Sequence, residues 1–408
     1  MVEREFRLYG YRWVVLAVFM FINLTIQILW ISYAGITGPA AEFYGVSDLQ
    51  IGLLAMSFML VFIPLSLPVS WAIDTQGFRK AVGIGAILMG LFGIIRGLAG
   101  DNYTLVLLST LGIAIAQPFL LNAWTTVPAK WFSIEGRATA VGLVVLSNLL
   151  GAALGLVLTP IFVEEMDVAI PTVQLVYGAI AAFSAVLFIV LARENPPTPP
   201  CPPGLEIRAL MLDGLKQALR VKSFVLFLIV WFIGMAAFNG VTTWVEAIVR
   251  PKGITPTEAG TIGALMLVGG IFGAVILPAI SDKQQKRLRY LLLGFSLAIP
   301  ALLGLAFAEQ FWVLLVAAIA LGFFLVGASP IGMQYATEVT FPTPEGTSNG
   351  LIQLCGQASV LVVFIMEVVS GDDGSFTTSL LITTALMIIS VLLISRMKEA
   401  DKQTAPAV

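Results

Sequence analysis

The chain has 408 residues, of which 58% are hydrophobic and only 11% are charged. Soluble domains carry about 25% charged residues, so this composition excludes a soluble multidomain protein as well as a disordered chain. The formal net charge of -2 provides no basic excess for a nucleic-acid partner. The sequence contains no histidine, which removes the most common metal ligand and the usual general base near neutral pH.

Apolar windows long enough to cross a bilayer, which takes about 20 residues per helix, occur twelve times along the chain. The predicted spans are 11–36, 50–73, 81–99, 103–127, 138–163, 170–192, 223–248, 256–281, 290–308, 311–336, 347–369 and 374–395. The first window is too long for a signal-peptide core, so it is expected to remain as a helix. The pattern predicts an all-α membrane protein with twelve transmembrane helices.

Lys and Arg residues are distributed unevenly between the two sides of these spans. Nineteen of the 22 lie before the first span, after the last span, or in the loops that share their side. Only Arg96, Arg250 and Lys252 fall on the other side. This bias predicts that both termini are cytoplasmic, and an odd number of spans would break it. We expect a multi-pass protein of the cell (plasma) membrane.

A Pro-rich stretch, residues 194–204, separates the sixth span from the seventh and cannot be helical. Residues 205–223 form an amphipathic pattern with scattered basic residues, which predicts a cytoplasmic helix on the membrane surface; a plain tether is the alternative. The expected organisation is an N-terminal six-helix half at 1–193, a linker at 194–222, a C-terminal six-helix half at 223–396 and a cytoplasmic tail at 397–408.

A charged pattern recurs at half the chain length. Asp74 and Arg79, between spans 2 and 3, match Asp282 and Arg287, between spans 8 and 9, at an offset of 208. A second pair repeats at an offset of 210, namely Glu135-Gly136 and Glu345-Gly346. The recurrence predicts two homologous six-helix halves. Parallel repeats of this kind place a substrate site between them, near the middle of the membrane.

The first copy reads S-W-A-I-D-T-Q-G-F-R-K from Ser70 and resembles the signature of the major facilitator superfamily, G-x-x-x-D-x-x-G-x-R-K. Ser70 replaces the first glycine. An Asp at a helix end can accept hydrogen bonds from a neighbouring helix N-terminus and pair with Arg, while glycine permits a tight turn. The predicted gating residues, which would hold the cytoplasmic side closed, are Asp74, Gly77, Arg79, Asp282 and Arg287. The alternative is ordinary loop charge beside a single Asp.

Several segments in both halves resemble a more specific group, the feline-leukaemia-virus-subgroup-C-receptor-related family. They are RWVVL at 12–16, FYGVS at 43–47, IPLSLPVSW at 63–71, KWF at 130–132, SNLLGAALG at 147–155 and EGTSNGLIQLCGQ at 345–357. The resemblance implies transport of a small organic cation or amine such as choline or ethanolamine, with haem and vitamin-like cations also proposed for the family.

The family's choline site, as the resemblance implies, has a Trp in span 1, a Gln in span 5, an aromatic residue in span 7 and a Gln in span 11. Trp30 and Gln357 match the first and last of these positions. The chain departs from the pattern in spans 5 and 7. The span 5 position is occupied by Leu149, which lies next to Asn148. The span 7 position is occupied by Asn239, which lies next to Phe238.

Uncharged polar groups inside a membrane span must face the helix bundle or a wet cavity. The predicted substrate-binding residues are Trp30, Gln117, Asn148, Phe238, Asn239 and Gln357. Trp30 maps onto Phe238 at the offset of 208, and such a pair of rings can enclose a cation with a gain of roughly 0.5–2 kcal/mol per ring. The alternatives are hydrogen bonds that only join helices and, for aromatic residues, a position at the lipid interface, which suits Trp244 best.

Charged residues inside the spans are few, and Arg96, Glu246 and Glu367 lie toward the outer ends, where pairing or snorkelling explains them. The lack of a clear mid-span carboxylate favours facilitated diffusion by alternating access, and Glu367 is the residue to test for ion coupling. The alternatives are a proton-coupled exporter of drugs or metabolites and a membrane receptor that does not transport. No Walker A motif is present. We expect no enzymatic activity, no cofactor, no metal and no nucleic acid, and a monomer whose partners are its small-molecule substrate and the lipid bilayer.

Overall fold

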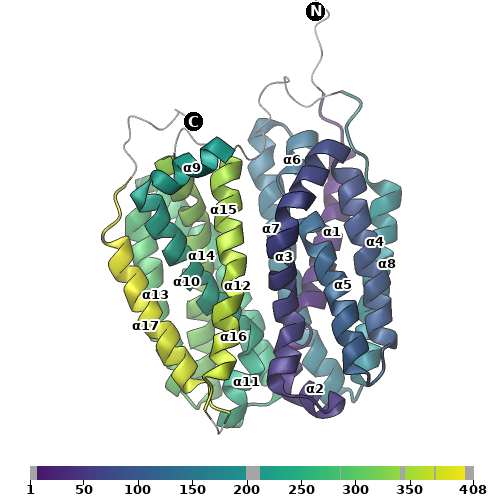
Figure 1. The fold of residues 1–408 in the computed structure, drawn as a ribbon, viewed down its shortest axis with the longest axis vertical. Helices are drawn as coiled ribbons and strands as arrows, with labels where there is room; N and C mark the ends of the chain where they lie inside the picture. The colour runs from purple at the N-terminus through teal and green to yellow at the C-terminus, as the bar shows by residue number, and fades with distance from the viewer. Residues whose placement is uncertain (1–6, 199–211, 285, 341–344, 372–373, 400–408) are drawn as a thin grey trace, which may run out of the picture. The chain divides into compact units, whose positions relative to one another are not determined.

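The computed structural model describes residues 7–198, 212–284, 286–340, 345–371 and 374–399. The chain divides into two compact units, Met1–Glu206 and Ile207–Val408, and each is a bundle of helices (Figure 1). The described ranges contain helices and connecting turns but no β-strand.

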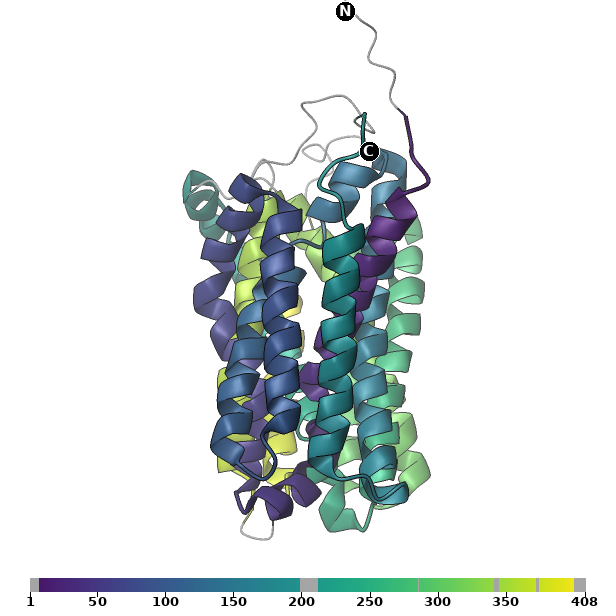
Figure 2. The same ribbon diagram turned by 90° about the vertical axis from the view of Figure 1, so that its right-hand side faces the viewer.

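In the N-terminal unit, Tyr9 and Thr198 are joined through their hydroxyl groups (3.1 Å), so both ends of this unit lie at one end of its bundle. We call this the terminal end, and the opposite end, which carries α2, the distal end. The helices are α1 (Arg12–Ile31), η1 (Ala34–Ile36), α2 (Thr37–Tyr44), α3 (Asp48–Gln76), α4 (Phe78–Leu98), α5 (Tyr103–Leu121), α6 (Thr126–Trp131), α7 (Ile134–Pro160), the π-helical turn η2 (Ile161–Glu165) and α8 (Ile170–Leu191). The first and last long helices of the unit, α1 and α8, lie side by side (Figure 2).

In the C-terminal unit, the backbone N–H of Lys398 donates to the hydroxyl of Ser223 (3.4 Å), which defines the terminal end of this bundle in the same way. The helices are α9 (Leu212–Arg220), α10 (Lys222–Thr243), α11 (Val245–Val249), η3 (Arg250–Lys252), α12 (Pro256–Gln284), α13 (Arg287–Phe307), α14 (Phe311–Thr340), α15 (Glu345–Ala358), α16 (Val360–Val368) and α17 (Thr377–Ile394).

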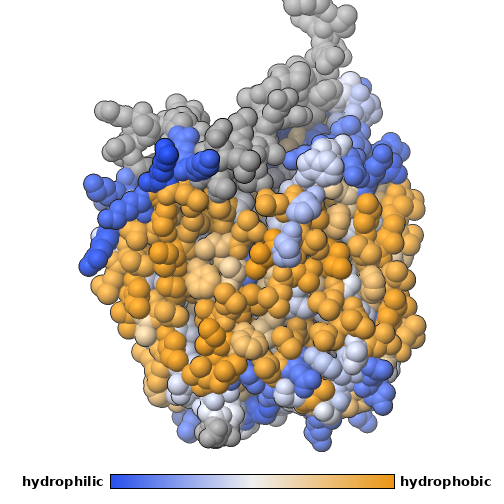
Figure 3. All heavy atoms as spheres, viewed as in Figure 1, coloured by the Kyte–Doolittle hydropathy of each residue, from blue (hydrophilic) through white to orange (hydrophobic). Residues whose placement is uncertain are grey.

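The described residues contain twelve helices that are long and apolar enough to cross a membrane, which confirms the predicted fold class. On the face drawn in Figure 3, apolar side chains cover the middle of the helices and hydrophilic side chains gather at their ends. Phe183, Phe272 and Leu392 each leave more than half of the side chain exposed (58%, 60% and 58%). Apolar surface on this scale is suited to lipid rather than to water, so the chain is a multi-pass membrane protein.

Several of the predicted spans are interrupted helices. Span 1 leaves its α-helix after Ile31, and span 4 breaks at residues 122–125, between α5 and α6. Pro128, in the first turn of α6, fits the second break, because proline lacks the N–H that would bond the carbonyl of Trp124, four residues earlier. Span 7 bends at Trp244 and span 11 at Ser359. At such points backbone groups and side chains are free to make contacts outside their own helix.

Glycine permits backbone contact between helices in both units. A Cβ atom at Gly322 on α14 would lie 1.7 Å from the carbonyl oxygen of Met266 on α12. In the N-terminal unit, a Cβ atom at Gly97 on α4 would lie 2.2 Å from Leu175 Cα on α8, and Gly151 on α7 meets α1 equally closely. Small residues at these positions let membrane helices pack with little space between them.

The predicted surface helix at 205–223 is described only from Leu212 onward, where α9 runs to Arg220. α9 packs against α10 and α15, with Ala218 fully buried. Lys216 and Arg220 are exposed. The described part of this segment therefore has one face against protein and basic side chains on another.

Candidate functional site

Trp30 lies in the last turn of α1, next to the interruption of span 1. Its indole N–H donates a hydrogen bond to the carbonyl oxygen of Ala55 on α3 (3.2 Å), and the ring is half-buried against the core of the N-terminal unit. Because the one polar atom of the indole is used in this bond, the ring has only its apolar faces and edges left for other contacts. An oriented π face is what a bound organic cation requires.

A pair of buried amides lies one helical turn from Trp30. The Gln27 side chain donates to Asn148 Oδ1 on α7 (2.9 Å), and Asn148 donates to the carbonyl oxygen of Val144 (2.9 Å). Asn148 therefore joins α7 to α1 in the layer next to the ring. Leu149, the position that the resemblance aligns with the family's span 5 Gln, is half-buried.

Gln117 on α5 is 5% exposed, and its side-chain oxygen has no hydrogen-bond partner among the described residues. Leaving such a group unpaired costs about 1–3 kcal/mol, so it needs an explanation. Asn122, five residues later, is satisfied, because it donates to the Ser66 carbonyl (2.9 Å) and the Ser70 hydroxyl (3.0 Å). The Gln117 oxygen therefore lacks a donor among the described residues, whereas the Asn122 amide nitrogen is used.

Trp124, in the turn between α5 and α6, is a residue that the sequence interpretation missed. Its indole N–H donates to Asn23 Oδ1 on α1 (2.8 Å), and Asn23 is fully buried. The Trp124 ring is half-buried against the same core as Trp30. The signal in the sequence was Pro128, which removes the helical hydrogen bond to the Trp124 carbonyl and so predicts a break in span 4 and a change in the direction of nearby side chains.

In the C-terminal unit, Phe238 on α10 and Gln357 on α15 are both half-buried. The neighbouring Asn239 is buried and donates to the hydroxyl of Ser359 (3.1 Å), at the interruption of span 11. Asn239 is thus used to join two helices. The Gln357 side chain makes no hydrogen bond with another residue in the described ranges.

The prediction that Trp244 lies at the lipid interface is wrong. Its side chain is fully buried, its indole N–H donates to the Val363 carbonyl (2.9 Å), and its ring packs on Phe376 with centroids 5.6 Å apart. The reason is the end of α10 at Thr243, because the backbone turns at Trp244 and directs the ring into the bundle.

At the terminal end of the N-terminal unit, the carboxylate of Glu194 makes the contacts that the sequence predicted for Asp74. It accepts the backbone N–H groups of Phe78 (3.2 Å) and Arg79 (2.7 Å) and forms an ion pair with Lys130. Phe78 and Arg79 are the first two residues of α4, so their N–H groups have no partner within the helix. The positive end of the helix dipole adds to the attraction.

Asp74 lies in the last turn of α3 with an exposed side chain, and it makes no hydrogen bond or ion pair with any other described residue. The expected pairing with Arg79 is thus absent from this part of the chain. The physical reason is that Asp74 lies at the C-terminus of α3, whose free carbonyl groups repel a carboxylate. Gly77 forms the predicted tight turn with a φ of 88°, and a Cβ atom there would lie 2.6 Å from Glu194 Oε1.

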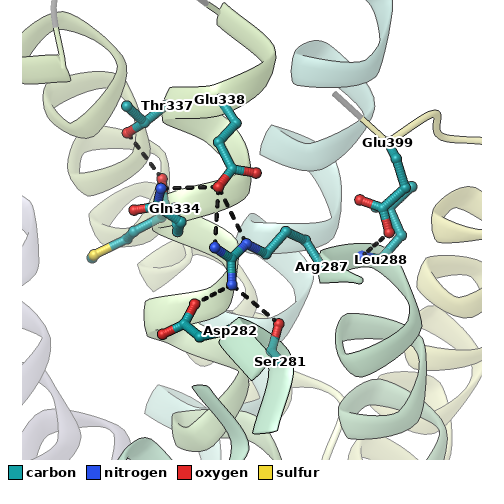
Figure 4. A network of polar contacts seen from close by, with 9 residues as sticks. Ser281, Asp282, Arg287, Leu288, Gln334, Thr337, Glu338 and Glu399 are labelled. Carbon is teal, nitrogen blue, oxygen red and sulfur yellow. Dashed lines mark hydrogen bonds and ion pairs between the residues drawn. The ribbon is translucent and has the colours of Figure 1, made fainter. Parts of the chain in front are cut away.

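In the C-terminal unit, the corresponding charges form a network around Arg287 (Figure 4). Its guanidinium forms ion pairs with Asp282 and with Glu338 on α14 (3.2 Å). Gln334 donates to the same oxygen of Glu338 (2.9 Å). The ion pair expected between Asp282 and Arg287 is therefore present. Arg287 also pairs with Glu338, a carboxylate outside the repeated motif.

Glu399 is the counterpart of Glu194 in the C-terminal unit. Its Oε1 accepts the N–H of Leu288, the second residue of α13 (2.9 Å; Figure 4). Partial burial raises the pKa of the Glu399 carboxyl above its ordinary value, and the hydrogen bond from Leu288 opposes this effect. In each unit, a glutamate a few residues after the last span thus caps the third of its six spans.

The residue before each of these glutamates is also held. Trp131 donates its indole N–H to the carbonyl of Arg193 (3.1 Å), and Tyr335 donates its hydroxyl to the carbonyl of Lys398 (2.8 Å). Both aromatic residues lie near the terminal end of the fourth span of their unit. The recurrence shows that the two units share this way of fixing their last residues.

The chemistry that these residues offer is that of binding. Among the described residues, no group of three His, Cys, Asp or Glu side chains could hold a metal ion. The middle of each unit brings together neutral amides, hydroxyl groups and aromatic rings, while ionised groups lie mainly toward the ends of the helices. Such a set can bind and orient a neutral or cationic solute.

Twelve spans in two units with this kind of interior define a membrane transporter. The model of the Major Facilitator Superfamily matches residues 13–364 and again 247–407, so the chain belongs to this superfamily.

Curated relatives confirm the predicted resemblance to the receptor-related family. The chain is 28% identical to the choline/ethanolamine transporter flvcr2b of Danio rerio, over 95% of this chain and 84% of the relative. It is 28% identical to the choline/ethanolamine transporter FLVCR2 of Homo sapiens, over 87% of this chain and 71% of the relative. It is 30% identical to the choline/ethanolamine transporter FLVCR1 of Felis catus, over 85% of this chain and 65% of the relative.

Among solved structures, a bacterial homolog of the human lysosomal transporter Spinster, in an inward-facing and unoccupied conformation, has a TM-score of 0.74 to this chain. The two are 17% identical, and the match covers 94% of this chain and 96% of the other. This likeness supports the all-α fold of twelve spans.

Proposed function

We propose that the protein moves a small organic cation or amine, such as choline or ethanolamine, by alternating access. The observation that carries the proposal is the half-buried Trp30 ring, whose N–H is bonded to the Ala55 carbonyl. One helical turn before it on α1 lies Gln27, whose neutral amide is bonded to that of Asn148. A π face attracts a weakly hydrated cation, and neutral amides do so without the strong binding of a carboxylate. The relatives named as choline/ethanolamine transporters support the same substrate class.

The residues proposed to contact or surround the substrate are Trp30, Gln117, Asn148, Phe238, Asn239 and Gln357. Within this set, Gln117 and Gln357 make no hydrogen bond with other described residues, so they are available to a substrate hydroxyl or ammonium group. Asn148 and Asn239 are held by other helices and are proposed to fix the walls on which the rings lie.

We propose facilitated diffusion rather than proton coupling, with both termini in the cytoplasm and the plasma membrane as location. The buried charge in the spans of the N-terminal unit, Arg96, donates to the Leu29 carbonyl at the end of α1 (2.9 Å), which gives it a structural use. Glu367 lies in the last turn of α16, away from the middle of its span. The Lys and Arg bias of the loops supports the orientation.

The charged residues at the terminal ends are proposed to control opening toward the cytoplasm. Asp74→Asn is expected to slow choline uptake into proteoliposomes while leaving the affinity for choline unchanged, because Asp74 lies far along α3 from Ala55 and Trp30. Uptake assays measure the rate of transport, and a thermal-shift titration measures the affinity for choline. Uptake equal to that of the unmodified protein would exclude Asp74 from gating.

The proposed substrate class is tested by a thermal-shift screen of the purified protein against choline, ethanolamine, other quaternary amines, vitamins and haem. A ligand at 100 times its dissociation constant stabilises the protein by about 2.7 kcal/mol. We expect a shift with choline that Trp30→Ala reduces and Trp312→Ala retains, since Trp312 is 72% exposed on α14.

Flux measurements then separate the alternatives. Choline uptake into proteoliposomes that does not depend on a pH gradient would support facilitated diffusion. Dependence on the gradient that Glu367→Gln removes would favour the proton-coupled exporter. Binding without flux would favour a receptor, and no binding of any amine would overturn the substrate class.

A further inference from the structure

Arg96 is a fully buried charge within the third span. It lies in the last turn of α4 and is 1% exposed. None of the described carboxylates forms an ion pair with it. Because burying a charge without a carboxylate partner is costly in free energy, the position of this residue requires a reason.

The guanidinium of Arg96 is directed at the end of α1. Its Nη1 donates to the Leu29 carbonyl oxygen (2.9 Å), and its Nη2 donates to the Ser32 hydroxyl oxygen (3.4 Å). α1 ends at Ile31, so its last carbonyl groups lack partners within the helix and form the negative end of the helix dipole. The charge of Arg96 is therefore compensated by a helix end instead of by a carboxylate.

The Leu29 carbonyl is also part of the backbone that carries Trp30. A peptide group is planar, and it joins the carbonyl of one residue rigidly to the Cα atom of the next. Arg96 thus holds the backbone at Trp30, while the Ala55 carbonyl on α3 accepts the indole N–H at the far side of the same residue (3.2 Å). The Trp30 side chain is consequently fixed at its base from α4 and at its ring from α3.

Two further contacts connect Arg96 and the interruption of span 1 to other helices. The Ser32 hydroxyl that accepts from Arg96 donates to Gln174 Oε1 on α8 (3.3 Å), and Gln174 is fully buried. The guanidinium carbon of Arg96 lies 5.6 Å from the centroid of the Tyr33 ring, whose hydroxyl is joined to that of Tyr44 on α2 (3.0 Å). The interruption of span 1 is therefore connected to α2, α4 and α8 around one guanidinium.

We propose that Arg96 is a positioning residue for the substrate, which holds the base of Trp30 so that the indole ring meets the cation in a fixed place. This inference rests on the proposed transport of organic cations and adds to it a residue that touches no substrate. The two acceptors on span 1 are bonded by different nitrogen atoms of one planar group, which arginine has and lysine lacks. The role therefore depends on the guanidinium and not on the positive charge alone.

Arg96→Lys separates these two properties, because it keeps the charge and removes the planar group. The affinity for choline is measured by equilibrium binding of radiolabelled choline to the purified full-length protein, and the unfolding temperature without ligand reports the stability. We expect choline to bind about 3- to 10-fold more weakly in Arg96→Lys, because the Trp30 ring is held less firmly.

A double variant with Trp30→Ala shows whether the effect passes through the ring. When no ring remains to be positioned, Arg96→Lys should change the residual affinity for choline by less than about 2-fold. A purely structural role of Arg96 predicts a different pattern, in which the unfolding temperature falls in both backgrounds and the affinity does not depend on the combination.

Ser32→Ala repeats the test with a smaller change and serves if Arg96→Lys does not fold. It removes the acceptor of Nη2 and leaves the bond to Leu29. We therefore expect a loss of choline affinity of about 2- to 3-fold, which should also disappear in the Trp30→Ala background.

Ser184→Ala is the matched control, because it removes a buried hydroxyl that also joins α8 to α1. The Ser184 hydroxyl is bonded to that of Thr25 (3.1 Å), which lies more than one turn before Trp30 and away from the end of α1. Its loss should lower the unfolding temperature while the affinity for choline stays the same.

The two proposals fail in distinguishable ways. An unmodified protein that binds none of choline, ethanolamine and tetramethylammonium would overturn the organic-cation function and this inference with it. An unmodified protein that binds choline would overturn the role of Arg96 alone in either of two cases. One is unchanged affinity in Arg96→Lys and Ser32→Ala, and the other is an equal loss of affinity with and without the Trp30 ring.

Discussion

In the N-terminal unit, Glu194 accepts two N–H groups at the start of α4, and in the C-terminal unit Glu399 accepts that of Leu288 at the start of α13. Away from these helix ends the units differ. α1 is joined to α7 by the amide of Gln27, whereas Met235 occupies the position on α10 that lies at the offset of 208.

The difference indicates which contacts the architecture needs and which a ligand needs. A helix that begins directly after a tight loop needs a carboxylate for its free N–H groups whatever the protein carries, and both units have one. The bond between two side-chain amides, Gln27 and Asn148, lies in the N-terminal unit, and we propose that it forms the polar wall beside the solute.

The largest expected effect concerns backbone packing, which is most extensive between α12 and α14 in one unit and between α4 and α8 in the other. Gly322→Ala places a methyl group where the Met266 carbonyl lies, 1.7 Å away, so the helices must separate. We expect a loss of more than about 3 kcal/mol, seen as a large drop in the unfolding temperature.

Gly142→Ala is the matched control for that substitution. Nothing lies within 4 Å of its Cβ position inside α7, so the change should be neutral or stabilise by up to about 1 kcal/mol. Equal unfolding temperatures for the two variants would contradict the packing described for the C-terminal unit.

The next effect compares the two capping glutamates. Glu194→Gln removes the charge from a carboxylate that binds two N–H groups and Lys130, whereas Glu399→Gln affects a group that caps Leu288. We expect a loss of about 2 kcal/mol for the first and about 1 kcal/mol for the second, from the strength of charge-assisted hydrogen bonds. Thermal unfolding of both variants checks the order. A larger loss in Glu399→Gln than in Glu194→Gln would contradict the stronger capping role assigned to Glu194.

A smaller effect distinguishes the aromatic rings of the two units. Trp30→Ala should weaken choline binding by about 3- to 30-fold, and Phe238→Ala by less, because indole is the better partner for a cation. Titration of both purified variants with choline gives the ratio. A larger loss in Phe238→Ala would shift the main binding surface to the C-terminal unit.

The smallest effect concerns the two aspartates of the repeated motif. Asp282→Asn loses an ion pair with Arg287 whose Asp282 side chain is 62% exposed, so we expect a loss of about 0.5–1 kcal/mol that high salt reduces. Asp74→Asn should alter the stability by less than about 0.5 kcal/mol, since Asp74 is exposed and Lys130, whose charge acts on it, forms its ion pair with Glu194 instead. Unfolding at low and high salt compares them, and an equal salt dependence would indicate that Asp74 has a partner.

The fold was predictable because a helix in lipid needs an apolar sequence of sufficient length whatever its neighbours are. The site was predictable only in part. The contact of Trp124 with Asn23 depends on which helices lie side by side, and a sequence window contains no information about that. The motif around Asp74 suggested a carboxylate at a helix N-terminus, but the carboxylate comes from Glu194, which is 115 residues from Arg79.

Those long separations have a consequence for biosynthesis. Because a chain is made from its N-terminus, α4 remains uncapped until the ribosome has passed Glu194, and α13 remains so until Glu399, which is 111 residues beyond Leu288. Each half therefore completes its own contacts only when its last span has been made, and the first half does so before the second exists. A gene cut between the two units would leave both caps intact.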